Sequence, residues 1–390
     1  MSQTEWPLRA ARVERGWSQS RAAEELAAVA AQRGVAVAAP LSLKTQLSRW
    51  ENQHALPDEH YRALLCELYQ STLVELGLLD PSDQGDTRRS EAEELRAALA
   101  ASAAIDDSAL ELIRGQLEST RALDDRLGAA AVAGSAQAQL SYLEGALRHA
   151  VNPTTRRLLG HLVVDAATLT GRLALDLARP TEAWRCGETA KVGAREAESA
   201  TLLAYAMVEQ SAVLVEVGEP STAVGLVEQA FSMVSGDTPG RVRAWFEAAR
   251  GAAMANAGAA GEAHAAYQSA ERELAERAGR MEITYPALPI EFDLRALHRH
   301  RGHAYRLLRE DESAIEELQR ALRAGGTSAR ELAGIHLDLA WAHGAIGQEA
   351  EASSHARSAR DIATRIGSAR LAAQLDSGRT HAVPERITRS

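Results

Sequence analysis

The sequence predicts an all-α protein, and three observations support that prediction. Ala, Leu, Glu and Arg, which favour helices, are abundant, whereas aromatic residues make up only 4% of the chain. Apolar residues recur at spacings of three and four, and alternating apolar and polar runs are almost absent. A pattern of small residues also repeats along the second half of the chain, which is typical of stacked helical pairs.

Length and composition set the broad class of the protein. A chain of 390 residues that is 46% apolar can form two or more packed domains. Its two cysteines, Cys66 and Cys186, match no metal-binding spacing and predict no disulfide framework. The first residues do not form an apolar leader, and the chain contains no uncharged apolar stretch of eighteen residues. We therefore expect a cytoplasmic protein that is neither secreted nor inserted in a membrane.

The first block of the chain contains signals for several short helices. An amphipathic helix is expected from Leu8 and should end at Gly16, because glycine favours a helix stop. Ser18 can cap a second helix, because its side chain can accept a hydrogen bond from a backbone amide. Ser42 can cap a third helix over Leu43–Glu51 in the same way. Two further short helices are expected at 61–65 and 73–76.

This block resembles the XRE family of helix-turn-helix proteins, which are related to phage repressors. The matching elements are L-R-x-x-R-x-x-x-G-W-S-Q from Leu8, then A-x-x-L, then L-S-R-W-E, and finally Pro57. The connection Ala27–Leu41 departs from the family, which makes a tight turn there. The resemblance implies that residues 1–79 form a DNA-binding domain whose partner is a double-stranded operator.

The resemblance also implies which side chains contact DNA. In this family the third helix lies in the major groove, and its early residues reach base edges. Lys and Arg can donate to guanine, Gln can pair with adenine, and Thr offers a hydroxyl and a methyl group. By position, the candidate base-reading residues are Lys44, Thr45, Gln46 and Arg49, with Asn52 as a base or phosphate contact and Ser18 and Gln19 as phosphate contacts. An ordinary solvated helix face is the alternative interpretation for Lys44 and Arg49.

The formal net charge of the chain is −10, which by itself does not suggest a nucleic-acid partner. Residues 1–80 carry eight basic and ten acidic side chains, so DNA binding must depend on an uneven distribution of charge. That balance favours a homodimer that reads two half-sites. Leu47 and Trp50 fall on the opposite face of the third helix and should lie in the core, and Glu51 should pair with Arg12 inside the domain.

The segment 80–90 is rich in charges and helix breakers and has no apolar periodicity, so we interpret it as a linker. Helices are then expected from Glu91 to about 104, at 108–128 and at 135–150. The region 91–152 can connect the two domains, mediate dimerisation or simply pack into a core. The sequence leaves these alternatives open.

Small residues repeat in the region that follows. Alanine pairs seven residues apart occur at 183/190, 223/230, 263/270, 314/321 and 352/359. A small residue stands twelve positions before each pair, namely Gly171, Ser211, Gly251, Gly302 and Ala340. Successive units are therefore 40, 40, 51 and 38 residues apart, and small side chains at these points would let two antiparallel helices approach closely. Turns between the paired helices are expected at 179–180, 218–220, 258, 309–311 and 347.

This pattern resembles the tetratricopeptide repeat (TPR), in which a small residue of one helix meets alanines of the next, and it covers residues 165–367. The units exceed the usual length of roughly 34 residues and lack a regular terminal proline, so we describe them as TPR-like. The resemblance implies an α-solenoid sensor domain over 153–376, followed by a flexible tail over 377–390. Such solenoids bind peptides or partner helices in a concave groove.

The first helix of each unit supplies the expected inner face of that groove. The candidate residues are Asp165, Thr168, Arg172, Tyr205, Val208, Trp245, Asn256, Arg299, His303, Arg306 and Trp341. Aromatic contacts, an anchored carboxylate and amide hydrogen bonds could together hold a short peptide. Packing is the alternative interpretation for the tryptophans, and a plain helix surface is the alternative for the segment 298–303. Its histidines, at 298, 300 and 303, do not share one helix face, so we expect no metal site.

The joined architecture resembles peptide-responsive helix-turn-helix regulators of Gram-positive bacteria, which act in quorum sensing. The resemblance implies a transcriptional regulator whose effector, a peptide or a small molecule, changes how a homodimer presents its DNA-binding domains. The sequence has no hydrolase, nucleotide-binding or metalloprotease motif, so we expect neither an enzyme nor a cofactor. The rival interpretation is a TPR interaction scaffold whose helix-turn-helix is vestigial or binds a protein.

Overall fold

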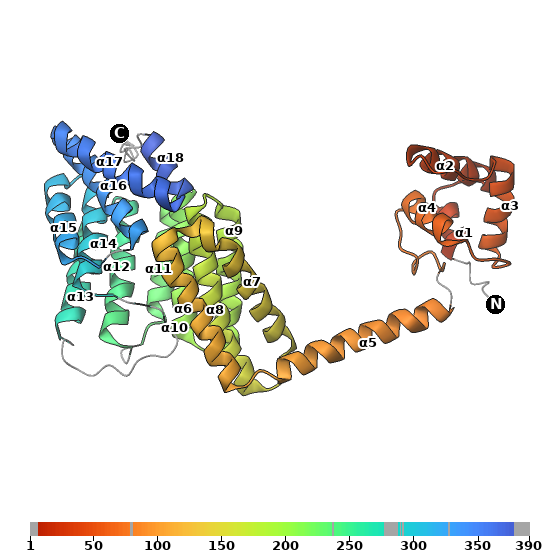
Figure 1. The fold of residues 1–390 in the computed structure, drawn as a ribbon, viewed down its shortest axis with the longest axis horizontal. Coiled ribbons are helices and arrows are strands. Elements are labelled where there is room, and N and C mark those ends of the chain that lie inside the picture. The colour runs from red at the N-terminus through yellow and green to blue at the C-terminus, as the bar shows by residue number, and fades with distance from the viewer. Residues whose placement is uncertain are drawn as a thin grey trace, which may run out of the picture. The chain divides into compact units, whose positions relative to one another are not determined.

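The structure is a computed structural model, and it describes residues 7–78, 81–235, 238–276, 288, 290, 292–326 and 328–377. For residues 81–89 it describes the backbone alone. Across the described residues the protein is all-α, with eighteen helices and no strand, which confirms the predicted fold class at this level (Figure 1). The chain divides into two compact units, Met1–Ala97 and Ala98–Ser390, which we call the first and second units.

The first unit contains four short helices and the start of a long one. They are α1 (Pro7–Glu14), α2 (Gln19–Gln32), α3 (Pro40–Glu51), α4 (Glu59–Tyr69) and α5 (Pro81–Ala103), of which α5 continues into the second unit. Gly16 has a φ of 66°, and Ser18 caps α2 by accepting a hydrogen bond of 3.2 Å from the backbone amide of Arg21, as predicted. Leu47 is fully buried and Trp50 nearly so, which confirms their expected place in the core of this unit.

The end of α2, the start of α3 and the segment 73–76 differ from the sequence-based expectation. α2 continues to Gln32, so the connection to α3 is shorter than predicted. α3 begins at Pro40, whose fixed φ suits the first position of a helix, so Ser42 lies inside α3 and does not cap it. The segment expected to be a helix at 73–76 is a single turn, in which the Leu76 amide donates to the Thr72 carbonyl at 3.0 Å.

The region after the first unit is helical and largely packed. α5 begins at Pro81, so the helix expected from Glu91 also includes most of the segment that we interpret as a linker. α6 (Asp107–Leu127) and α7 (Ala129–His149) pack against each other and against α8 (Pro153–Asp176). Leu117, Leu143 and Leu159 are buried together there. Core packing therefore explains the inner faces of α6 and α7.

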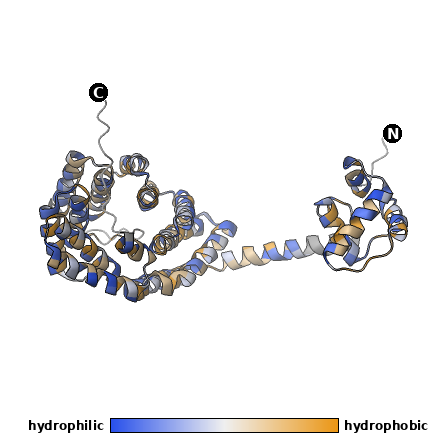
Figure 2. Ribbon diagram, turned by 90° about the horizontal axis from the view of Figure 1, so that it is seen from above, coloured by the Kyte–Doolittle hydropathy of each residue, from blue (hydrophilic) through white to orange (hydrophobic). Residues whose placement is uncertain are grey.

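From α8 onward the helices pack in consecutive pairs. The pairs are α8 with α9 (Pro180–Glu196), α10 (Ala200–Glu216) with α11 (Pro220–Ser232), α12 (Gly240–Asn256) with α13 (Ala260–Glu276), α14 (Leu294–Leu307) with α15 (Asp311–Ala324), and α16 (Ala329–Ala345) with α17 (Glu349–Ile366). A short final helix, α18 (Ala369–Ser377), follows them. Most helices carry both hydrophilic and hydrophobic residues, as amphipathic helices do (Figure 2).

The turn inside each pair has a left-handed residue at an equivalent position. These residues are Ala178, Gly218, Gly258, Arg309 and Gly347, with φ angles of 57°, 85°, 76°, 65° and 78°. The second helix of every pair begins two residues later. Because the intervals between these residues equal those of the alanine pairs, the repeat in the sequence is also a repeat in backbone conformation.

The small residues lie where the paired helices touch. A Cβ atom at Gly251 would be 2.7 Å from the Tyr267 ring, and one at Gly302 would be 2.6 Å from the Leu318 side chain. Nine of the ten paired alanines are buried, and Ala352 is half-buried. These observations confirm that the repeated small residues allow close helix packing.

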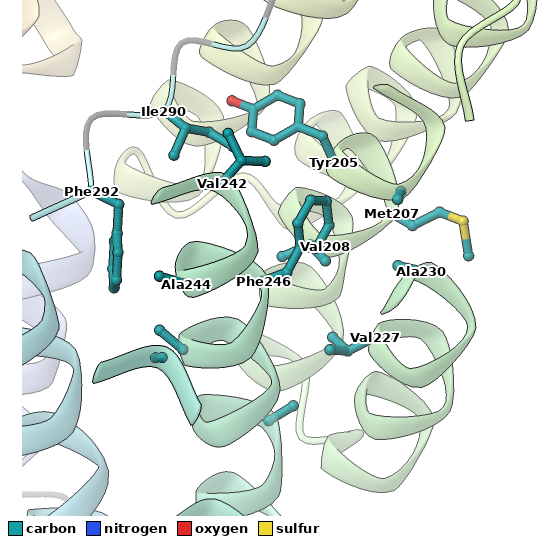
Figure 3. Close-up of a cluster of buried hydrophobic side chains, with 14 of the residues drawn as sticks. Tyr205, Met207, Val208, Val227, Ala230, Val242, Ala244, Phe246, Ile290 and Phe292 are labelled. Atoms are coloured by element: carbon teal, nitrogen blue, oxygen red, sulfur yellow. The ribbon is translucent and has the colours of Figure 1, made fainter. Parts of the chain in front are cut away.

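The centre of the second unit is a continuous apolar core. Figure 3 shows Tyr205 and Val208 of α10 beside Phe246 of α12, with Val227 of α11 on the other side. α8 is long and apolar enough to cross a membrane by length and composition, but 72% of its most apolar window is buried. Packing within this core accounts for the apolar character of α8.

The last helices of the second unit pack on its first ones. α16 and α17 contact α6, and α18 contacts α8. Arg330 on α16 donates to both carboxylate oxygens of Asp124 on α6, at 2.7 and 2.5 Å. Its Nε lies 3.3 Å from Oδ2 of Asp176 on α8, whose Oδ1 accepts a hydrogen bond of 2.6 Å from Ser368. We call Asp124, Asp176, Arg330 and Ser368 the closing interlock, because they join the two ends of this unit.

Candidate functional site

The outward face of α3 has no exposed carboxylate and is polar apart from Leu41, which is 83% exposed at the start of the helix. Lys44, Thr45, Arg49 and Asn52 are exposed on it, whereas Leu43, Leu47 and Trp50 are buried on the opposite face. Among the described residues, the side chains of Lys44 and Arg49 have no ion-pair or hydrogen-bond partner. The arrangement leaves two positive charges and several hydrogen-bonding groups open to a ligand.

The acidic residue of α3 is held inside the first unit. Glu51 is 1% exposed and accepts two hydrogen bonds from Arg12, at 2.6 and 2.8 Å, which confirms the predicted pair. Arg12 also donates to the carbonyl oxygen of Trp17 at 2.7 Å. The hydrogen bond to Glu51 is the main reason that the pKa of Arg12 is raised. This bidentate pair fixes α3 to α1 and removes the negative charge from the face of α3.

Gln19 also belongs to this internal network. Its Nε2 donates to Glu51 Oε2 at 2.8 Å, so the amide is half-buried and engaged within the unit. In this structure Gln19 therefore joins α2 to α3 through one of the two N–H donors of its amide, and its predicted phosphate contact would use the other. Ser18 is exposed at the same end of α2, where its oxygen caps the helix.

The remaining candidate DNA contacts differ in their freedom to bind. Thr45 donates from Oγ1 to the Leu41 carbonyl at 3.2 Å, and Asn52 donates from Nδ2 to the Ser48 carbonyl at 2.7 Å. Both bonds stay within α3, so each side chain keeps an exposed polar atom able to bind elsewhere. Gln46 is half-buried, and its Oε1 is buried without a hydrogen-bond partner among the described residues.

The candidate groove residues are distributed over the first helices of the five pairs, as expected. Thr168, Tyr205, Val208 and Arg306 are buried, and Arg172 is exposed. The half-buried residues are Asp165, Trp245, Asn256, Arg299, His303 and Trp341. The structure therefore gives these positions unequal access to a ligand.

The aromatic members near the middle of the unit take part in packing. The rings of Tyr205 and Trp245 are 5.3 Å apart, and Trp245 meets Phe246 edge to face at 5.0 Å. Burial raises the pKa of Tyr205 to about 12. Asn256 donates to the Ala252 carbonyl of its own helix at 2.8 Å. Packing thus accounts for much of the role of Tyr205 and Trp245.

Most charged candidates are paired with a neighbouring helix. Asp165 forms an ion pair with Arg121 of α6, and Arg299 lies 2.9 Å from Glu331 of α16. Arg172 lies 3.7 Å from Glu209 of α10, and burial raises the pKa of Glu209 in spite of this arginine. The sequence did not indicate these carboxylate and arginine partners, because they lie on other helices.

Two basic side chains of α14 contact the same carboxylate of α16. His303 Nδ1 lies 2.8 Å from Asp338, and Arg306 Nε donates to the same carboxyl group at 3.0 Å. Burial alone would raise the pKa of Asp338, but the charges of His303 and Arg306 outweigh burial and lower it. Arg306 also lies over the Trp341 ring, 4.7 Å from its centroid. A hollow of about 430 Å³ opens beside Trp341.

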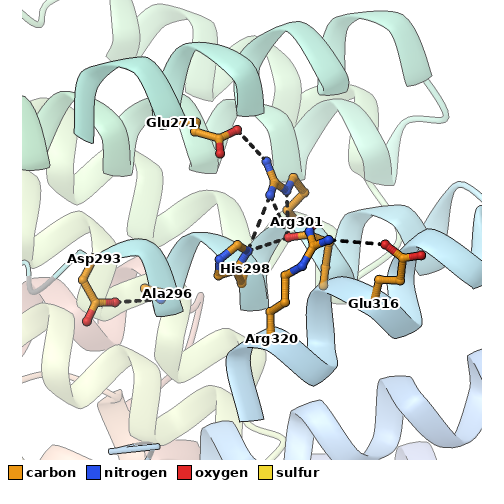
Figure 4. Close-up of polar contacts among 8 residues, drawn as sticks. Glu271, Asp293, Ala296, His298, Arg301, Glu316 and Arg320 are labelled. Carbon is orange, nitrogen blue, oxygen red and sulfur yellow. Dashed lines mark hydrogen bonds and ion pairs between the residues drawn. The ribbon is translucent and has the colours of Figure 1, made fainter. Parts of the chain in front are cut away.

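The histidine-rich segment at the start of α14 forms a structural ion-pair network. Arg301 is 9% exposed and lies 2.9 Å from Glu271 of α13 and 2.8 Å from Glu317 of α15. His298 Nδ1 approaches Glu317 at 2.7 Å, and Figure 4 shows His298 close to Arg301. In the part of the chain that the structure describes, no three His, Cys, Asp or Glu side chains cluster as metal ligands. The network connects three neighbouring helices.

No protein-family model matches the chain, and the search of curated proteins gives no match either.

Proposed function

We propose that the protein is a sequence-specific DNA-binding transcriptional regulator. The observation that carries this proposal is the outward face of α3, which presents Lys44 and Arg49 without a competing carboxylate. In this proposal the first unit is a helix-turn-helix domain and α3 enters the major groove. The chain is acidic as a whole, but the carboxylate of α3 is buried and paired, so the exposed charges of this helix are positive.

We further propose that the second unit is a TPR-like α-solenoid that senses an effector, a peptide or a small molecule. Support comes from the five helix pairs, their common turn conformation and the small residues between their helices. Among the candidate groove positions, Arg172 is exposed and His303 is 44% exposed in its side chain. A cytoplasmic regulator without a catalytic role or a cofactor fits these features.

A homodimer would allow two copies of α3 to read two half-sites. Large apolar side chains are exposed on α5, α6 and α7, namely Leu95, Leu99, Leu112, Leu123, Leu127 and Tyr142. They are suitable for a contact between two copies, because burying apolar surface favours association. The region 91–152 is therefore proposed to combine core packing with dimerisation.

The DNA-binding proposal is tested by selecting bound sequences from random DNA and measuring affinity for the selected site. Lys44→Ala combined with Arg49→Ala should weaken that affinity by about 100-fold or more, because each base contact contributes roughly 1–3 kcal/mol. Arg157→Ala combined with Arg195→Ala removes the same charge from the second unit and should have little effect. If the wild-type protein selects no sequence, the interaction scaffold becomes the better proposal.

A further inference from the structure

A hollow lies where the turn between α14 and α15 faces the end of α16. It has a volume of about 430 Å³ and is lined by Arg309, Asp311, Ala340, Trp341, Gly344 and Ala345. Three of these residues are Ala or Gly on the last two turns of α16, so the floor of the hollow is formed by small side chains. The remaining three supply a carboxylate, an indole ring and a guanidinium group.

The carboxylate of this hollow has two arginines nearby but forms no direct ion pair with them among the described residues. Asp311 begins α15, and among the described residues it has no hydrogen-bond or ion-pair partner. Burial raises its pKa, and the charges of Arg309 and Arg306 counteract that effect only in part. A carboxylate that is partly desolvated and has no direct partner is stabilised when a cation binds beside it.

The indole ring of Trp341 already interacts with one cation. Arg306 lies over it at 4.7 Å from the centroid, and the charge of Arg306 is committed to Asp338. Trp341 is half-buried and also lines the hollow, whereas Arg306 does not line it. The electron-rich face of an indole attracts cations, so a positive group in the hollow can contact the part of this ring that lines it.

The end of α16 adds a third negative feature. This helix ends at Ala345, which lines the hollow, and the carbonyl groups of Ala342, His343 and Gly344 accept hydrogen bonds from the turn that follows. A helix C-terminus has a partial negative charge that stabilises nearby cations. Arg309 is the opposing group, since it is exposed at the rim and is positive. Its removal should therefore strengthen the binding of a cation.

We propose that this hollow binds an organic cation, a guanidinium or primary ammonium group, such as the basic side chain of a peptide. The cation would lie between the Asp311 carboxylate and the Trp341 ring, with its stem over Ala340 and Gly344. The inference rests on the proposed sensor function, because it names the chemistry of the effector. It stands apart from the DNA-binding proposal, since the hollow can bind a cation whether or not α3 binds DNA.

The test uses the full-length protein without DNA and two capped tripeptides, Gly-Arg-Gly and Gly-citrulline-Gly. Citrulline has the shape of arginine without its charge. Calorimetric titration at low salt should detect the arginine peptide and give at least tenfold weaker binding for the citrulline peptide. Asp311→Asn should weaken the arginine peptide by about tenfold, and Arg309→Ala should strengthen it.

Glu312→Gln is the matched control, because Glu312 is the next residue of α15, is exposed and does not line the hollow. It should leave the affinity for the arginine peptide unchanged. Trp341→Phe, which keeps a ring of lower cation affinity, should give an intermediate loss. Equal binding of the two peptides, no binding of either, or equal effects of Asp311→Asn and Glu312→Gln would overturn the proposal. Circular dichroism of each variant separates these results from loss of folding.

Discussion

The two units use their charged side chains differently. In the first unit, the side chains of Lys44 and Arg49 on α3 have no partner among the described residues. In the second unit, most charged candidate residues on the first helices of the pairs form ion pairs with a neighbouring helix. The first unit uses one internal ion pair, Arg12–Glu51, to keep its outer face positive. The second unit uses its ion pairs to connect helices. Charged side chains thus remain unpaired on the exposed face of α3, whereas in the second unit they connect helices.

The largest expected effect comes from breaking the internal pair of the first unit. Arg12→Ala leaves Glu51 buried without its main partner, and such a change costs about 3–5 kcal/mol. Denaturant unfolding should show this loss for the first unit alone, and binding to the selected DNA should fall with it. Arg21→Ala removes an exposed pair on α2 and should cost less than about 1 kcal/mol. Comparable losses for both variants would mean that Glu51 does not need its partner.

A smaller but related effect is expected at the closing interlock. Arg330→Ala leaves Asp124 and Asp176 buried, although Asp176 keeps its bond from Ser368, so the second unit should lose about 3 kcal/mol. The unfolding transition of the first unit should not move. Arg360→Ala, which removes an exposed ion pair between α17 and α18, is the control and should change little. A shift of both transitions by Arg330→Ala would show that the units are coupled.

The smallest effect concerns pH and is confined to the second unit. His336 and His355 meet through their Nδ1 atoms at 2.9 Å, a contact in which at least one nitrogen must be unprotonated. Burial lowers the pKa of both, and burial also lowers the pKa of His161 and His300. Because the unfolded chain binds these protons more readily, stability should be full above about pH 6.5 and should decline as the pH falls below it.

This pH dependence is measured as the midpoint of thermal unfolding between pH 7.5 and 5.5. The midpoint of the second unit should fall on acidification, and the double variant His336→Asn with His355→Asn should make the decline shallower without removing it, because His161 and His300 remain. If the midpoint of the double variant fell as steeply as that of the wild type, the His336–His355 pair would not contribute to the pH dependence.

Local and repeated features were predictable from the sequence. The Arg12–Glu51 pair followed from two short segments whose spacing and resemblance placed them on facing helices. The alanine pairs and their preceding small residues predicted five helix pairs, because close packing restricts side-chain size at every repeat. The α3 boundary was wrong because Pro40 and Ser42 are both good helix-start residues, and the proline begins the helix.

Contacts between distant helices were not predictable in this way. Periodicity shows which residues share one face of a helix, but it does not show which neighbour covers that face. Tyr205 and Val208 were therefore assigned to a groove, although both side chains of α10 are buried against neighbouring helices. Asp124 and Arg330 are 206 residues apart and belong to no common repeat, so nothing in the chain indicates that they meet.

The closing interlock also bears on how the chain is made. Its hydrogen bonds join residues that are 206 and 192 positions apart. These contacts of the second unit can therefore form only after its last helices have been synthesised. The neighbouring pairs have local contacts and can form during synthesis, and the first unit is complete earlier still. For much of translation a folded first unit is therefore attached to a second unit whose ends have not yet joined, and Asp124 and Asp176 remain hydrated until Arg330 and Ser368 arrive.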